Sequence, residues 1–425
     1  MNGDRTNLGA SDARQAIAAS CTPEQRLVMA MLASPAAGNL WGDPGEIAAA
    51  VSWDRFLVAT DPMVKPYLHW VCQTGAFSAA VPDFVQLELS AARRAAGLRN
   101  LRWSAELRQI LEKFRNESIP LIVVKGAVLQ RSVYPDPSTR PMSDIDLCVR
   151  DADMARVYRA LTDLGFAGRV PREGQTPIVG DSVHEEGTFL KKIGDTALLL
   201  EVHTQLEMYS GYQVPPWGKC IEIRGGDGIE VPALDPHTAL RHICFHLARH
   251  GFEHGLMWLL DVRLFVEKNR ALMRWPEFVA ECDPPSRPLL ACTLALASEW
   301  LGADIPQRAL EAISAEKKLR SAPLIWSQLW EGDRITHPLP VVTLLLSGDL
   351  RRILDHLRDR VRSWTAPLPG SDLSRGALVY RRLRTVVLIL YFNIRSGGFR
   401  LSSLRATRHS DRRFQQLRAL LWPPA

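Results

Sequence analysis

Residues 121–149 read LIVVKGAVLQRSVYPDPSTRPMSDIDLCV, and this stretch decides the fold. Its first four residues are apolar and mostly β-branched, and the pair Lys125-Gly126 follows them directly. A short apolar run that ends in a glycine turn is typical of a buried strand. Another apolar run, over residues 145–149, predicts a second strand close behind the first. Two strands this close together indicate the start of a small α/β unit.

Turn and cap signals predict the helices of this unit. A short helix is expected over residues 127–133, because Pro135 cannot continue it. Asp151 is expected to cap a second helix that runs to about Leu164. Gly165 follows at the position where helices commonly end.

The later part of the unit is expected to contain two more strands, over residues 188–193 and 197–203, around the turn Gly194-Asp195. Residues 168–187 are rich in glycine, proline and charge, which predicts a loop. The α/β unit therefore extends over residues 119–234.

Helical periodicity surrounds the unit on both sides. The first helix is expected to begin at Thr22, where Pro23 and Gln25 complete the pattern of a capping box. The predicted divisions are a disordered tail over 1–20, a helical region over 21–118, the α/β core over 119–234, a helical domain over 235–349 and a basic helical region over 350–425. The predicted fold class is α+β and mostly helical, with a small sheet between helical regions.

Three acidic residues stand where strands would place them on one face. Successive side chains of a strand alternate between its faces, so Asp144 and Asp146 project together while Ile145 faces the core. Glu201 interrupts the apolar run 198–202, and an acid there is rarely buried without a partner. Facing carboxylates repel unless a cation lies between them, and Mg²⁺ prefers oxygen ligands. We therefore expect Asp144, Asp146 and Glu201 to be catalytic and to bind two metal ions that serve phosphoryl or nucleotidyl transfer.

The turn at Lys125-Gly126 is expected to bind phosphate. Glycine lets the backbone approach an anion, and the start of the following helix offers free N–H groups. Lys125 and Arg140 supply positive charge for a triphosphate, and Ser143 can donate a hydrogen bond to it. These four residues form the predicted nucleotide-binding site.

The motifs resemble those of the uncharacterised nucleotidyltransferase family, a branch of the DNA polymerase β-like nucleotidyltransferase superfamily. The features that match are Lys125-Gly126, Tyr134-Pro135, Arg140, Asp144-Ile145-Asp146-Leu147, Glu201-Val202-His203, Trp53-Asp54 and Trp258-Leu259-Leu260-Asp261. The resemblance covers residues 22–270, and the chain has Lys125-Gly126 where the wider superfamily usually has a Gly-Ser turn. It implies a mixed sheet with helices on one side, an NTP as donor, and Mg²⁺ as cofactor with Mn²⁺ as the alternative.

Other polar residues are candidates for a substrate cleft. His242, His246, His250 and His254 recur every four residues and would form a stripe on a helix. No glutamate follows His246 as a zinc protease would need, and no third ligand is obvious, so core packing and capping hydrogen bonds are the first expectation for the stripe. The residues expected to line a cleft are His203, His250, Trp258 and Asp261. For Asp261 an arginine contact is an equal alternative, and His203 is also placed to orient a carboxylate.

Positive charge is concentrated at the C-terminal end. Residues 351–425 hold 16 Arg and 4 acidic residues, a balance of +12, whereas the whole chain has a net charge of +6. Such a segment can bind nucleic acid or an anionic membrane surface. Pairing with acidic surface elsewhere in the chain is the first expectation, so nucleic acid is an allowed partner that is not favoured.

Cysteine spacing and hydropathy bear on the compartment. The seven cysteines form no CxxC pair, which supports neither a thiolate zinc site nor a disulfide framework. No apolar stretch reaches the length of a transmembrane helix, and the N-terminus lacks an apolar signal core. We expect a cytoplasmic protein without a transmembrane segment.

The function that these features predict is Mg²⁺-dependent transfer of a nucleoside monophosphate from an NTP, with ATP among the candidates. The acceptor is unknown and is expected to be a small molecule, a peptide or a protein in biosynthetic tailoring. Two alternatives stay open: a non-catalytic module that binds nucleotide or phosphate, and an RNA-directed nucleotidyltransferase that uses the basic C-terminal region as a clamp.

Overall fold

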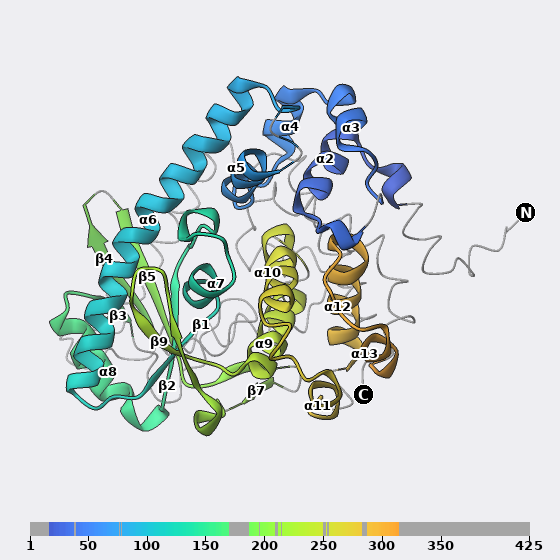
Figure 1. Cartoon of the computed structure of the whole chain (residues 1–425). Helices are drawn as coiled ribbons and strands as arrows, with labels where there is room; N and C mark the ends of the chain where they lie inside the picture. The colour runs from blue at the N-terminus through green and yellow to red at the C-terminus, as the bar shows by residue number, and fades with distance from the viewer. Residues whose placement is uncertain are drawn as a thin grey trace, which may run out of the picture.

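A small sheet lies at one end of a larger body of helices (Figure 1). The computed structural model describes residues 17–313, apart from the gaps 38–39, 76, 78, 170–186, 195, 209–210, 214, 250–251, 253–254 and 283–286. The fold is α+β and mostly helical, as the sequence predicts. The basic region over 350–425 lies outside the described residues, as do residues 1–16.

Five strands form the main sheet in the order β1-β2-β5-β4-β3. In that order, their bounds are Leu121–Val124, Ile145–Val149, Thr196–His203, Gly187–Ile193 and Ala167–Arg169. β2 and β5 run parallel and the other neighbours run antiparallel, so the sheet is mixed. The predicted strands are confirmed, β1 and β2 at the predicted bounds and β4 and β5 to within one residue.

Two short hairpins follow the main sheet and were not predicted. They pair β6 (Leu206–Met208) with β7 (Gly211–Gln213), and β8 (Ile221–Arg224) with β9 (Glu230–Ala233). β3 was not predicted either, since its last two residues fall in the loop expected over 168–187. These strands have three or four residues each, which is too short for an alternating pattern to stand out.

The α-helices lie before, within and after the sheet unit. Their bounds are α2 Pro23–Leu32, α3 Pro44–Ala50, α4 Trp53–Ala59, α5 Lys65–Thr74, α6 Asp83–Asn116, α7 Gly126–Ser132, α8 Met154–Asp163, α9 Pro236–Arg249, α10 Gly255–Lys268, α11 Trp275–Ala280, α12 Arg287–Leu301 and α13 Gln307–Ala312. Among the described residues, no helix has both the length and the hydropathy that crossing a membrane requires.

The two faces of the sheet are covered differently. Val123 and Leu147 point to one face, where they form a core with α8 and the second half of α6. Val124 and Cys148 point to the other face, which has only a small apolar cluster. Asp146 precedes Leu147 on β2, so strand alternation places it on this second, less covered face.

Helices from both sides of the sheet unit share one hydrophobic core, which includes residues of α2, α5, α9, α10 and α12. The Trp41 indole N–H donates to the Trp300 carbonyl at 2.9 Å. The Arg263 guanidinium donates to the Leu32 carbonyl at 2.7 Å. The helical regions that are separate in sequence are therefore one body in space, beside the sheet (Figure 1).

The 34-residue helix α6 connects this body to the sheet. Val85 and Leu89 near its start belong to the core of the helical body. Ile110 and Phe114 near its end belong to the core beneath the sheet. At 1.5 Å per residue the helix is about 50 Å long, and it runs along one side of the molecule (Figure 1).

Of the predictions about helix starts and the N-terminal tail, one is confirmed and two are wrong. Thr22 caps α2 through a complete capping box with Gln25. Asp151 does not cap a helix, because it lies in a 3₁₀ turn and α8 begins only at Met154. Residues 17–20 are helical, and Ile17 is buried in the core, so the expected disordered tail over 1–20 extends too far. Ile17 is the one large apolar residue of the segment 17–20, so the sequence there shows no helical periodicity.

Candidate active site

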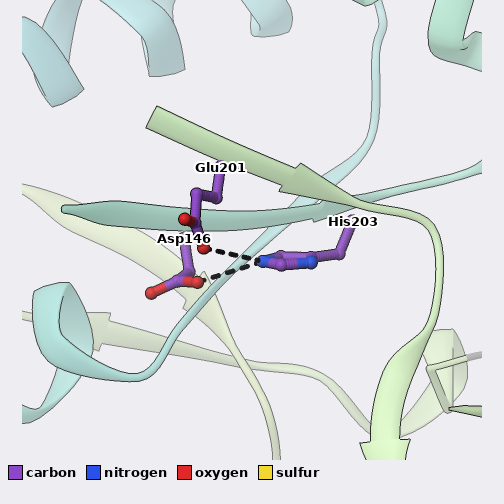
Figure 2. Close-up of side chains that lie close together, drawn as sticks. All are labelled: Asp146, Glu201 and His203. Atoms are coloured by element: carbon purple, nitrogen blue, oxygen red, sulfur yellow. Dashed lines mark hydrogen bonds and ion pairs between the residues drawn. The ribbon is translucent and has the colours of Figure 1, made fainter. Parts of the chain in front are cut away.

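Strand register places Asp146 beside Glu201. In the parallel pair of β2 and β5, Asp146 is the partner of Glu201, and Cys148 is the partner of His203. Asp146 is buried, whereas Glu201 and His203 are half-buried. The three side chains point toward one another (Figure 2), and one ligand atom from each lies within 4.8 Å of the others.

The imidazole of His203 closes this group. Its Nε2 lies 3.0 Å from Oδ1 of Asp146 and 3.9 Å from Oε2 of Glu201 (Figure 2). His203 follows Glu201 by two residues on β5, so alternation brings both side chains to one face. Of the roles considered for His203, the structure favours contact with the carboxylates.

Lys125 supplies positive charge to the same carboxylate. Its Nζ donates to Oδ1 of Asp146 at 2.8 Å. Lys125 lies between β1 and α7 with φ 52° and ψ −129°, a conformation that side-chain-bearing residues rarely adopt. Strained backbone of this kind persists only where surrounding contacts hold it, and such residues concentrate at functional sites.

The charges around the two aspartates act in opposite directions. Burial tends to raise the pKa of Asp146, but Lys125 and His203 outweigh it and hold that pKa well below its ordinary value. Burial, and then the charge of Asp146, raises the pKa of Asp144 to about 6, against the opposing effects of Lys125, Ser143 and Arg140. Asp146 is therefore a firmly ionised carboxylate, and Asp144 is the more easily protonated of the two.

Asp144 lies just before β2 and is half-buried, and Ser143 beside it is exposed. The group of ligand atoms within 4.8 Å consists of Asp146, Glu201 and His203, without Asp144. The charge of Asp144 nevertheless interacts with that of Asp146. Metal binding by Asp144 stays a prediction, and His203 joins the candidates for that role.

Arg140 makes a different contact from the one predicted. Its Nε and Nη2 donate to Oδ1 and Oδ2 of Asp261 on α10, each at 2.8 Å. The Tyr134 hydroxyl also donates to Oδ1 of Asp261, at 2.6 Å. Burial tends to lower the pKa of Arg140, but the charge and hydrogen bonds of Asp261 raise it above its ordinary value. The guanidinium expected on a triphosphate is thus buried in an ion pair, and Asp261 has the arginine contact rather than a place in a cleft.

Gly126 lies beneath this guanidinium. A Cβ at Gly126 would be 2.6 Å from Nη1 of Arg140, which is closer than real Cβ atoms approach other atoms. The backbone that follows Lys125 is therefore in direct contact with the Arg140–Asp261 pair.

The remaining candidates lie on the helices after the sheet. The Trp258 ring, on α10, is half-buried and its centroid is 4.7 Å from that of the His246 ring on α9. His250 and His254 lie outside the described residues. The histidine stripe thus packs at least partly against α10, in line with the first expectation for it.

The side chains around Asp146 fit a divalent cation. Two carboxylates and an imidazole converge on the less covered face of the sheet, and a lysine ammonium already lies against one of them. Oxygen ligands suit Mg²⁺ and Mn²⁺, and imidazole nitrogen suits transition-metal ions. Within the described part of the chain, no other set of three such residues comes this close together.

The model of a family described as uncharacterised nucleotidyltransferases matches residues 49–302, which is more than half of the chain. The chain belongs to this nucleotidyltransferase family. The match includes the whole sheet, the group around Asp146 and most of the helical body. The sequence resemblance is therefore confirmed, and the helical body is part of the family's common unit.

Two solved structures are similar to this nucleotidyltransferase over part of its length. A solution structure of the antibiotic-resistance factor ANT(2'')-Ia has 17% identity and a TM-score of 0.30, covering 53% of this chain and 96% of that one. A crystal structure of ANT(2'')-Ia in complex with adenylyl-2''-tobramycin has 19% identity and a TM-score of 0.30, covering 44% and 95%. A search of curated proteins gave no significant match. The family assignment rests on the family match alone.

One residue near the candidate site was not singled out from the sequence. Asn100, in the middle of α6, is buried and donates from Nδ2 to the carbonyls of Pro137 at 2.6 Å and Arg140 at 2.8 Å. Asparagine is unfavourable inside helices, because its side chain competes for backbone hydrogen bonds. The one sequence signal for a special role of Asn100 was its position inside a long helical pattern.

Proposed function

We propose that this nucleotidyltransferase transfers a nucleoside monophosphate from an NTP to a hydroxyl or phosphate group of an acceptor. The observation that supports this most is the convergence of Asp146, Glu201 and His203 on one face of the family's sheet. A carboxylate-rich group beside a lysine suits a reaction in which a triphosphate and its cation are bound together.

The reaction is a displacement at the α-phosphorus. The acceptor oxygen forms a new bond to that phosphorus while the bond to the bridging oxygen breaks, and pyrophosphate leaves. When the acceptor is a hydroxyl, its proton passes to a carboxylate. We assign this role to Asp144, because it is partly exposed and its pKa is the higher of the two aspartates.

Asp146, Glu201 and His203 would hold Mg²⁺, with Mn²⁺ as the alternative, and Asp144 would contribute to a second ion. The metal, when bound, neutralises charge on the triphosphate. Lys125, Ser143 and the Gly126 backbone are the proposed nucleotide contacts. In this arrangement the Lys125 ammonium transfers its contact from Asp146 to a phosphate.

We place the activity in the cytoplasm and in biosynthetic tailoring of a small molecule, peptide or protein. The support for a reducing compartment is that the seven cysteines are odd in number and form no CxxC pair. The acceptor class rests on the family's general chemistry, and nucleic acid stays an allowed partner that is not favoured.

Calorimetric titration with each of the four ribonucleoside triphosphates, with and without Mg²⁺, tests the proposal without knowledge of the acceptor. We expect one triphosphate to bind in the micromolar to millimolar range only when Mg²⁺ is present, and Glu201→Gln to weaken that binding. Metal-independent binding would favour a non-catalytic phosphate-binding module. If none of the four triphosphates binds, the result would count against the nucleotidyltransferase activity and against the phosphate-binding module.

The ion preference is expected to depend on His203. Imidazole nitrogen binds first-row transition ions better than it binds Mg²⁺, so His203→Gln should weaken Co²⁺ binding about tenfold more than Mg²⁺ binding. Competition titrations give the ratio of the two dissociation constants, and each variant is its own control. An unchanged ratio would show that His203 is not a ligand.

A further inference from the structure

The buried pair of Arg140 and Asp261 joins the helical body to the loop that precedes Asp144. Asp261 lies in the middle of α10, and Arg140 lies four residues before Asp144. The two side chains are 5% and 3% exposed, and they meet through two parallel hydrogen bonds. The Tyr134 hydroxyl adds a third donor to the same carboxylate. Tyr134, Arg140 and Asp261 thus form one hydrogen-bonded network.

The network reaches the site without belonging to it. Nη1 of Arg140, which makes neither bond to Asp261, lies over Gly126. Gly126 follows Lys125, whose strained backbone brings its ammonium to Asp146. The charge of Arg140 also acts on Asp144. One guanidinium therefore contacts the lysine turn and also acts electrostatically on Asp144.

The backbone of the Arg140 loop is held from another side as well. Asn100 of α6 binds the carbonyls of Pro137 and Arg140, and Arg93 of α6 pairs with Asp136. The side chain of Arg140 is held by α10, and its main chain by α6. Both helices contribute residues to the core of the helical body, so that body sets the position of the loop.

We propose that the network of Tyr134, Arg140 and Asp261 is a positioning device for the active site. Asp261 and Tyr134 fix the guanidinium, and the guanidinium fixes the Lys125-Gly126 turn and the approach to Asp144. A buried ion pair is often no more stabilising than apolar side chains of similar volume, so stability alone does not account for this one. The inference extends the proposed function, because it assigns roles to residues that touch neither nucleotide nor metal.

The test compares Tyr134→Phe and Asp261→Asn with matched controls on another buried arginine. Arg131 of α7 donates to Ser104 of α6 and to Asp227 in the turn between β8 and β9, and its hydrogen bonds and ion pair do not involve α10. Ser104→Ala removes a hydroxyl from that arginine, as Tyr134→Phe does from the network. Asp227→Asn removes a carboxylate charge, as Asp261→Asn does.

Two readouts separate positioning from the proposed function. Hydrogen exchange of residues 122–146 is expected to be about tenfold faster in Tyr134→Phe than in Ser104→Ala, because the turn and loop lose their restraint. Mn²⁺ affinity, measured by electron paramagnetic resonance, is expected to fall about 10- to 100-fold in Tyr134→Phe and Asp261→Asn and to stay unchanged in the controls.

The outcomes decide separately on the proposed metal site and on the positioning role of the network. If wild-type protein binds no Mn²⁺, the proposed metal site fails, and hydrogen exchange alone decides the positioning role. If wild type binds Mn²⁺ and Tyr134→Phe shows wild-type exchange and wild-type affinity, the positioning role is overturned. Tyr134→Phe leaves the ion pair intact, so the test stands even if Asp261→Asn does not fold.

Discussion

Asp146→Asn is expected to abolish Mg²⁺-dependent nucleotide binding while the protein stays folded. The amide keeps the volume of the side chain and removes the negative charge that Lys125 and His203 contact. A hard divalent cation binds a neutral amide oxygen far more weakly than a carboxylate, so the Mg²⁺-dependent part of the triphosphate affinity should fall at least about 100-fold. That factor corresponds to about 2.8 kcal/mol.

The stability of this variant follows from two opposing pKa shifts. The lowered pKa of Asp146 means that its ionisation favours the folded state, and this contribution is complete at pH values above its ordinary pKa. The raised pKa of Asp144, partly caused by Asp146, means that ionisation of Asp144 disfavours the folded state above about pH 6. The substitution removes the first effect and weakens the second. Burial, the larger cause of the raised Asp144 pKa, is left in place, so the offset is partial and we expect the free energy of unfolding at about pH 8 to fall by about 0.5–3 kcal/mol.

Thermal unfolding without metal and calorimetric titration with Mg²⁺ and triphosphate measure the two quantities. Glu230→Gln is the matched control, because Glu230 is an exposed carboxylate on β9 that pairs with Arg224. It should leave both quantities unchanged. Wild-type affinity in Asp146→Asn would remove the central residue of the proposed site.

The local features of the sheet were predictable because short-range signals specify them. The apolar run before Lys125-Gly126 became β1, and the alternation of Asp146 with Leu147 gave the two faces of β2. Glu201 was identified as an acid inside an apolar run, and the parallel register then placed it opposite Asp146. Alternation on β5 also explains why His203 joined the group.

Contacts between distant segments could not be predicted in the same way. The Trp41 indole donates to the Trp300 carbonyl across the common helical core, and Trp41 lies in a turn, so no periodicity around it indicates a partner in α12. The interpretation of Arg140 depended on the same kind of information. An arginine near two aspartates suggested a phosphate contact, and its actual partner, Asp261, lies 121 residues away.

Arg140 and Asp261 also make the helical body and the active site depend on each other energetically. A charged side chain in the interior is stable only with its partner, because the partner replaces the lost hydration. The pair therefore penalises any arrangement in which α10 moves away from the Arg140 loop. This penalty can be measured as a change in the free energy of unfolding, separately from any change in metal affinity at the site.

Asp261→Ala is expected to lower the free energy of unfolding by about 3–5 kcal/mol, because it leaves the buried Arg140 charge and the Tyr134 hydroxyl without their acceptor. Denaturant unfolding of the wild type and the variant measures the difference. The triple variant Arg140→Met, Asp261→Leu, Tyr134→Phe removes every group that would be left unpaired, so it should recover most of the loss. A loss below about 1 kcal/mol in Asp261→Ala would show that water or another side chain replaces the carboxylate. A triple variant that regains stability and still binds Mn²⁺ weakly would separate the two roles of the pair, since its fold would be restored and the guanidinium over Gly126 would not.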